Sequence, residues 1–182
     1  MLYVKTALPD VYILEPTVYS DNRGYFMETY RKEDFDKHIS STSFIQDNQS
    51  KSTFGVLRGL HYQKGEWSQA KLVRVLQGRV IDVAVDLRRS SPTFGKHIMV
   101  ELTEENQFQL FIPRGFAHGF LVLSDTAVFI YKVDNHYMPS AEASIRFDDP
   151  QLAIPWPLQT DQLLLSPKDM QAVPFLQAEL FE

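Results

Sequence analysis

RVIDVAVDL, residues 79–87, is the most regular stretch of the sequence. Ile81, Val83, Val85 and Leu87 are apolar, and two of the three positions between them are aspartates. Apolar side chains at every second position predict a β-strand with one face in the core and a polar face outside. We therefore expect a half-buried strand in this part of the chain.

Similar strand patterns occur on both sides of this stretch. The alternation returns in residues 107–112, and runs rich in β-forming residues cover 11–19, 24–30, 44–50, 56–61, 71–76, 97–102, 119–123 and 127–133. Turn-forming residues separate the runs, and a helical pattern is limited to residues 31–39, 163–170 and the last eight residues. Many short strands without alternating helices predict an all-β antiparallel barrel or jelly roll with a pocket at its mouth. We expect one such domain over residues 1–182.

Composition narrows the class of protein. The 182 residues include 18 Lys and Arg against 23 Asp and Glu, a net charge of −5, and no basic run that would follow a phosphate backbone. We therefore expect no nucleic-acid partner. Apolar residues make up 44% of the chain, yet no uninterrupted run reaches the length of a membrane helix, so we expect no membrane span.

The absence of cysteine excludes disulfides and thiolate chemistry, and the first 16 residues carry no apolar leader. We expect a cytoplasmic protein.

Two of the five histidines lie in informative surroundings. The turn PRGFAH, residues 113–118, delivers His118 into a predicted strand and resembles the second motif of the cupin superfamily, where such a histidine often binds a metal. The first cupin motif supplies a His-x-His pair, whereas this sequence has His61-Tyr62-Gln63. Two separated histidines fall short of a three-ligand metal site. We therefore predict a barrel of the cupin type without a bound metal.

A metal-free barrel with a histidine suits proton transfer at carbon. This chemistry needs a base, a group that stabilises an enolate oxygen, and an acid. His61 is the candidate base, Asp169 its orienting carboxylate, Lys71 the group facing the oxyanion, and Tyr131 a hydroxyl on an inward strand face. Tyr131 also fits an ordinary core tyrosine, and Lys71 a solvated strand residue. The spacings alone leave both interpretations open.

Ordered motifs connect these residues to a known family. They are DNRGYFME (21–28), QDNQS (46–50), GVLRGLHYQ (55–63), AKLVRV (70–75), PRGFAHGF (113–120), YKV (131–133), YMP (137–139), Glu142 and LSPKD (165–169). In this order the sequence resembles the dTDP-4-dehydrorhamnose 3,5-epimerase family, cofactor-independent enzymes of dTDP-rhamnose synthesis. The Pro-x-Gly-x-x-His turn alone is a weak signal, but the ordered set is specific.

The resemblance implies roles for individual residues. His61 paired with Asp169 is the base, Tyr131 the acid on the opposite face, Lys71 the lysine near the sugar C4 oxygen, and His118 a sugar-binding residue. The other positions that match substrate contacts of the family are Arg23, Phe26, Glu28, Gln46, Asp47, Asn48, Arg58, Tyr137, Glu142 and Lys168. The family is also a homodimer in which N-terminal strands exchange and complete the nucleotide site of the partner.

The chemistry of the implied substrate agrees with these residue types. A 4-keto group acidifies the hydrogens at C3 and C5, and a cation at the ketone oxygen lowers the barrier to the enolate. One base and one acid across a pocket suffice for inversion, so we expect no nicotinamide, flavin or metal cofactor. Arg23, Arg58 and Lys168 are expected to neutralise the diphosphate, and Phe26 with Tyr137 to sandwich the thymine.

Two other functions remain open from the sequence. A relative that epimerises only C3 or only C5 of a related dTDP-4-keto deoxy-sugar would carry the same acid and base residues. A non-catalytic carbohydrate-binding jelly roll would need an aromatic platform but not the set of His61, Asp169 and Tyr131. Solvent exchange at a substrate carbon distinguishes the binding module from the enzymes, and product stereochemistry distinguishes the enzymes from one another.

Overall fold

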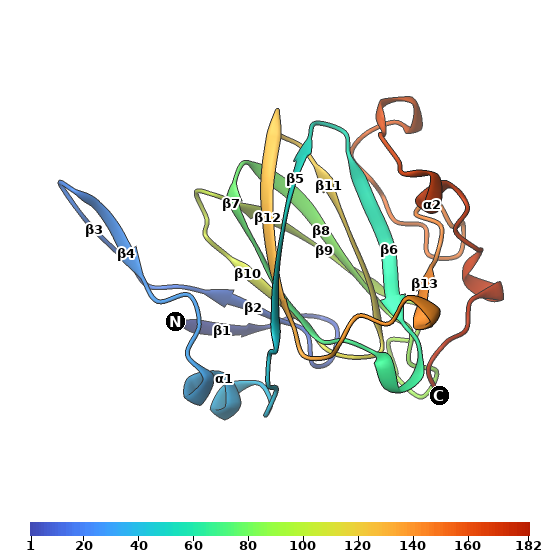
Figure 1. Ribbon diagram of the computed structural model, residues 1–182, viewed down its shortest axis with the longest axis horizontal. Helices are drawn as coiled ribbons and strands as arrows, with labels where there is room; N and C mark the ends of the chain where they lie inside the picture. Colours follow the sequence, from blue (N-terminus) through green and yellow to red (C-terminus); the bar gives the residue numbers. More distant parts are fainter.

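Two antiparallel sheets face each other in the computed structural model, which describes all 182 residues (Figure 1). The six-stranded sheet contains, in spatial order, β1 (Leu2–Lys5), β2 (Tyr12–Glu15), β10 (Gln109–Ile112), β7 (Lys71–Gln77), β12 (Thr126–Val133) and β5 (Gln46–Thr53). The five-stranded sheet contains β13 (Glu142–Ser144), β6 (Leu57–Gln63), β11 (Phe116–Val122), β8 (Arg79–Asp86) and β9 (His97–Thr103). This double-sheet arrangement confirms the predicted all-β jelly roll.

The main core lies between the two sheets. Val73 and Phe129 of the six-stranded sheet and Val80 and Phe120 of the five-stranded sheet belong to one buried cluster. The rings of Phe120 and Phe129 stack with their centroids 4.2 Å apart, so the two sheets are in direct contact there. Burial of these large side chains is the main force that holds the sheets together.

The expectation of a half-buried strand at residues 79–87 is wrong. β8 lies between β11 and β9, and both of its faces are covered. Val83 and Val85 pack against C-terminal residues that include Phe175, while Asp82 and Asp86 are fully buried. The aspartates tolerate burial because each has hydrogen-bond donors, as buried charges require. The polar face therefore points into the molecule.

A third, two-stranded sheet stands apart from the barrel. The hairpin of β3 (Val18–Asp21) and β4 (Gly24–Met27) projects from the N-terminal side of the molecule (Figure 1). Tyr19, Tyr25 and Phe26 are exposed on it, with Phe26 at 70%. Contiguous exposed aromatic residues of this kind mark an interaction site.

The helical segments are short. The elements are α1 (Lys32–His38), η1 (Gly65–Trp67), η2 (Pro139–Ala141), η3 (Thr160–Gln162), α2 (Pro167–Met170) and η4 (Phe175–Gln177). α1 confirms the helix predicted at residues 31–39, and its Phe35 is buried against Phe111 on the outer face of the six-stranded sheet. None of the helices has the length and apolar character needed to cross a membrane.

Several predicted boundaries differ from the structure. The run 11–19 divides into β2 and β3, since residues 16 and 17 belong to neither strand. The candidate helix at residues 163–170 begins only at Pro167, whose fixed φ suits a first helical position. The last eight residues contain only the single turn η4. β1 and β13 are short strands that the sequence pattern does not predict.

Candidate active site

His61 and His118 are neighbours on adjacent strands of the five-stranded sheet. They are direct register partners between β6 and β11, in a pairing that shifts after His118. Two glycines permit the close approach of the strands: Gly59 has a φ of +134°, and a Cβ on it would lie 2.5 Å from the Cα of Gly119. A side chain at either glycine would force these strands apart. The glycines of the two motifs thus bring the imidazoles together.

His61 forms a short hydrogen bond with a buried carboxylate. Its Nε2 lies 2.6 Å from Oδ1 of Asp169, a residue of α2 that is 4% exposed. Burial alone would raise the pKa of Asp169, but hydrogen bonds from His61 and Ser166 outweigh it and hold this pKa below its usual value. The ionised carboxylate accepts the Nε2 proton, so the Nδ1 lone pair of His61 is free to act as a base.

His118 belongs to a second, deeper histidine–aspartate pair. Its Nε2 lies 2.9 and 3.1 Å from the two carboxylate oxygens of Asp82. Burial lowers the pKa of His118, although Asp82 acts in the opposite direction. His118 is therefore neutral at neutral pH, with its Nε2–H donated to Asp82 and its Nδ1 available as an acceptor. Asp82 could not be found from the sequence, because the alternation of its strand assigned it to a solvent-facing side.

Lys71 and Tyr131 face the histidines from the six-stranded sheet. In register Lys71 pairs with Val133 and Tyr131 with Val73, so both side chains share the inward face that carries Val73. Burial lowers the pKa of Lys71 to about 8, opposed by the negative charges of Asp82 and Glu142. Burial also raises the pKa of Tyr131. Titratable side chains therefore lie on both walls of the barrel, and Tyr131 points inward as predicted.

Tyr137, Glu142 and Lys168 form a connected group close to the histidines. The Tyr137 hydroxyl donates to Oε2 of Glu142 at 2.6 Å, and the Lys168 ammonium forms an ion pair with Oε1 of the same carboxylate. Burial favours a higher pKa for Glu142, but its bonds to Lys168 and Tyr137 prevail and lower it. Arg58, at the start of β6, donates from Nε to the Ser52 hydroxyl at 3.2 Å.

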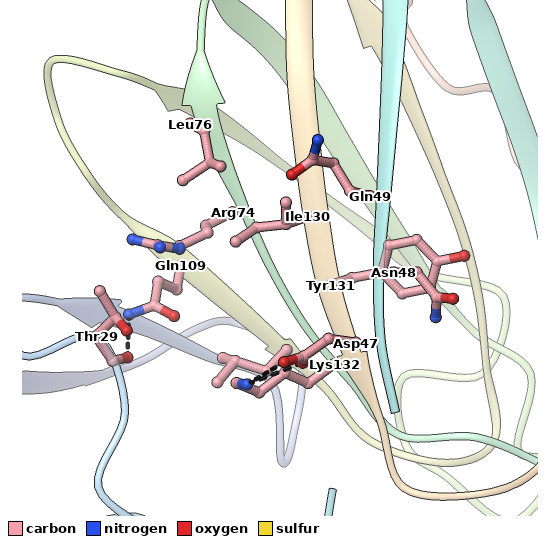
Figure 2. A pocket seen from close by; sticks show the side chains of 11 residues that line it. Thr29, Asp47, Asn48, Gln49, Arg74, Leu76, Gln109, Ile130, Tyr131 and Lys132 are labelled. Carbon is pink, nitrogen blue, oxygen red and sulfur yellow. Dashed lines mark hydrogen bonds and ion pairs between the residues drawn. The ribbon is translucent and has the colours of Figure 1, made fainter. Parts of the chain in front are cut away.

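The QDN stretch on β5 presents its side chains in two directions. Asn48 is the register partner of Tyr131 and lies on the same side, and Gln46 donates to Asn48 at 2.8 Å. Asp47 is paired in register with Lys132 and forms an ion pair with it at 2.8 Å, on the opposite side of the sheet. Figure 2 shows this ion pair at a pocket of about 350 Å³ on the outer face. The structure therefore does not bring Asp47 together with the inward-facing groups.

The predicted nucleotide-binding residues of the N-terminal segment lie outside the barrel. Arg23 is bound to Asp21 at 2.6 Å on the projecting hairpin, and its side chain is 85% exposed. Phe26 is exposed on the same hairpin, and Glu28 is paired with Arg31 at 2.7 Å. Within one chain the hairpin of β3 and β4 stands away from β6, the strand that contains His61 (Figure 1).

The fold and the site define a class of protein. A cupin-like jelly roll with a histidine–aspartate pair on one wall and a tyrosine on the other has the groups that an enzyme of proton transfer at carbon requires. No group of three or more His, Asp or Glu side chains is arranged to hold a metal ion.

Comparison with known proteins identifies the family. The sequence profile described as dTDP-4-dehydrorhamnose 3,5-epimerase matches residues 5–177. A protein of that name from Salmonella typhimurium is 52% identical over the full length of both chains. The crystal structure of the Elizabethkingia anophelis enzyme of the same name has a TM-score of 0.93 at 54% identity and covers 97% of each chain. A dTDP-6-deoxy-D-glucose-3,5-epimerase from Legionella pneumophila, in complex with dTDP-4-keto-L-rhamnose, has a TM-score of 0.95 at 46% identity and covers 100% of this chain and 97% of its own. The chain belongs to the dTDP-4-dehydrorhamnose 3,5-epimerase family.

Proposed function

We propose that the protein converts dTDP-4-dehydro-6-deoxy-D-glucose to dTDP-4-dehydro-L-rhamnose by inverting C3 and C5. The observation that carries this proposal is the placement of His61 with Asp169 on one wall of the barrel and Tyr131 on the other. Inversion requires removal of a proton from one face of the sugar and delivery to the other. Family membership supports the choice of substrate.

The base is His61 in this mechanism. Its Nδ1 takes the proton from the carbon next to the ketone, and the electron pair of the C–H bond moves into an enolate. Asp169 stabilises the imidazolium that forms, as a buried carboxylate does for other catalytic histidines. The Lys71 ammonium stabilises the enolate oxygen. His118 is neutral and donates its Nε2–H to Asp82, so its Nδ1 accepts a hydrogen bond from a sugar hydroxyl.

Tyr131 is the acid that completes the inversion. Burial raises the pKa of its hydroxyl, which keeps the proton in place until the enolate carbon accepts it. His61 ends the step protonated and Tyr131 deprotonated, so His61 must release a proton and Tyr131 must take one up before the second carbon reacts. The steps require no redox change at the sugar and no cofactor.

We also propose that the protein works as a homodimer with exchanged hairpins. Tyr19, Tyr25 and Phe26 are exposed on the projecting hairpin, which has no barrel of its own chain to cover it. The hairpin of one chain would bring Arg23, Phe26 and Glu28 to the site of the other. Arg23 would then join Arg58 and Lys168 at the diphosphate, where guanidinium groups bind phosphate in a bidentate manner.

Incubation with dTDP-4-dehydro-6-deoxy-D-glucose in heavy water tests the catalytic proposal. We expect deuterium at C3 and C5 of the inverted product. His61→Asn should abolish both exchange and turnover, because loss of a general base lowers rates by about 10²–10⁴. Tyr131→Phe should retain exchange with unchanged configuration, because His61 can return the proton to the face from which it came.

The matched control is Tyr62→Phe, which removes a buried hydroxyl from the other side of β6, where it donates to the Glu179 carbonyl at 2.8 Å. This variant should invert both carbons. If Tyr131→Phe stays folded and inverts both carbons at the normal rate, Tyr131 is not the acid. Label at only one carbon of the wild-type product would identify an enzyme that epimerises a single position.

A further inference from the structure

Ser166 holds the carboxylate of Asp169 from the side that His61 does not use. Its hydroxyl donates to Oδ2 of Asp169 at 2.6 Å and accepts the backbone N–H of Asp169 at 3.1 Å. Oδ1 of the same carboxylate receives His61 Nε2 at 2.6 Å and the Gly59 N–H at 3.4 Å. Each oxygen of the carboxylate therefore has its own donor.

We propose that Ser166 is a positioning residue for proton abstraction. By holding Oδ2 it fixes the rotation of the Asp169 carboxylate, so that Oδ1 stays in line with Nε2 of His61 and Nδ1 stays directed at the sugar. This inference rests on the proposed role of His61 as the base.

The carboxylate needs this second anchor because both other donors bind Oδ1, and only Ser166 holds Oδ2. The terminal torsion of an aspartate is broad, and the side chain of Asp169 is only 3% exposed, so bulk water does not orient it. α2 has four residues and is too short to be a rigid support by itself. A water that entered in place of the hydroxyl would not be tethered to the chain.

Ser166 is also the N-cap of α2, which suggests a purely structural role as the alternative. Two substitutions separate the roles. Ser166→Ala removes the hydroxyl and the cap, whereas Ser166→Gly removes the hydroxyl but leaves a residue that is tolerated at N-caps. If positioning is the role, the two variants lose the same activity. If capping is the role, Ser166→Gly stays close to wild type.

The activity measurement is the rate of deuterium exchange and of inversion at saturating dTDP-4-dehydro-6-deoxy-D-glucose. We expect kcat to fall about ten- to a hundredfold in both variants, the range for loss of one hydrogen bond to a charged group, with KM unchanged. Ser166→Thr keeps the hydroxyl, and its methyl group has room because Ser166 is exposed, so it should restore kcat.

A spectroscopic measurement tests positioning directly. The proton shared by His61 Nε2 and Asp169 gives a low-field ¹H resonance, which should shift or broaden in Ser166→Ala and return in Ser166→Thr. The control is Ser91→Ala, which removes a hydroxyl that donates at the same distance of 2.6 Å to another buried carboxylate, Asp86, outside the site. This variant should lower the melting temperature without changing kcat or the resonance.

The proposal is overturned if folded Ser166→Ala keeps the wild-type kcat and resonance, or if only KM or the melting temperature changes. Retained exchange in His61→Asn would instead remove the base assignment, and the role of Ser166 with it. Loss of exchange in His61→Asn together with normal exchange in Ser166→Ala and Ser166→Gly would refute the positioning role alone.

Discussion

Lys71→Met should stabilise the fold while it abolishes the reaction. Burial lowers the pKa of Lys71 from its ordinary value of 10.5 to about 8. A tenfold change in proton affinity corresponds to about 1.4 kcal/mol, so the buried ammonium destabilises the folded state by about 3 kcal/mol at pH 7. Methionine fills a similar volume without a charge, and the variant should gain a free energy of unfolding of this order.

The pH dependence of this gain identifies its cause. Below pH 8 the lysine is charged in the folded and the unfolded chain, and the full penalty is present. Between about pH 8 and 10.5 the unfolded chain binds more protons than the folded one, so the stability of the wild type rises with pH. The difference between Lys71→Met and the wild type should therefore shrink as the pH passes through this window.

Urea unfolding of both proteins at pH 7 and pH 10 measures this difference. The contributions of other titrating groups to the free energy of unfolding are the same in both proteins and cancel. Lys51→Met, which removes an exposed lysine from β5, is the control and should change stability little at either pH. Deuterium exchange into the substrate should be lost in Lys71→Met. If Lys71→Met gained the same stability at pH 7 and pH 10, or lost stability at pH 7, Lys71 would not be a buried cation that destabilises the folded state.

Two further predictions concern assembly and cofactors. Arg23→Ala and His61→Asn should each be inactive, but reassociated mixtures should regain about one quarter of wild-type activity per chain, since about half of the dimers are mixed and each holds one intact site. Mixtures that stay inactive although mixed dimers form would exclude hairpin exchange. Exhaustive chelation should leave turnover unchanged; a stoichiometric transition metal lost together with activity would contradict the metal-free mechanism.

The sequence predicts most strands because their periodicity is local. Tyr131 lies two positions from the core residue Phe129 on the same strand, so the alternation predicts that both point inward. The structure confirms this direction. The side to which Asp82 points could not be predicted in the same way. Its strand is covered on the outside by residues such as Phe175, which are distant in sequence, and local alternation contains no information about that cover.

The candidate site was predictable to different degrees. His61 and Asp169 are 108 positions apart, and only the resemblance to the family connects them in the sequence. Ser166 carried a local signal: a serine, then a proline, with an aspartate three positions after the serine, is a recognisable helix start. The ion pair of Asp47 with Lys132 follows from the register of β12 against β5, which no local pattern specifies.

The two histidine–aspartate pairs divide the work of the site by depth. The side chain of His61 is 29% exposed, whereas that of His118 is 9% exposed above a fully buried Asp82. A base must exchange its proton with solvent after every step, which the shallower pair permits. A binding residue must keep one protonation state, and burial of His118 disfavours its cation. In the proposed mechanism the same two side-chain types therefore supply a base at one depth and a fixed hydrogen-bond acceptor at the other, because only the shallower pair is in reach of solvent.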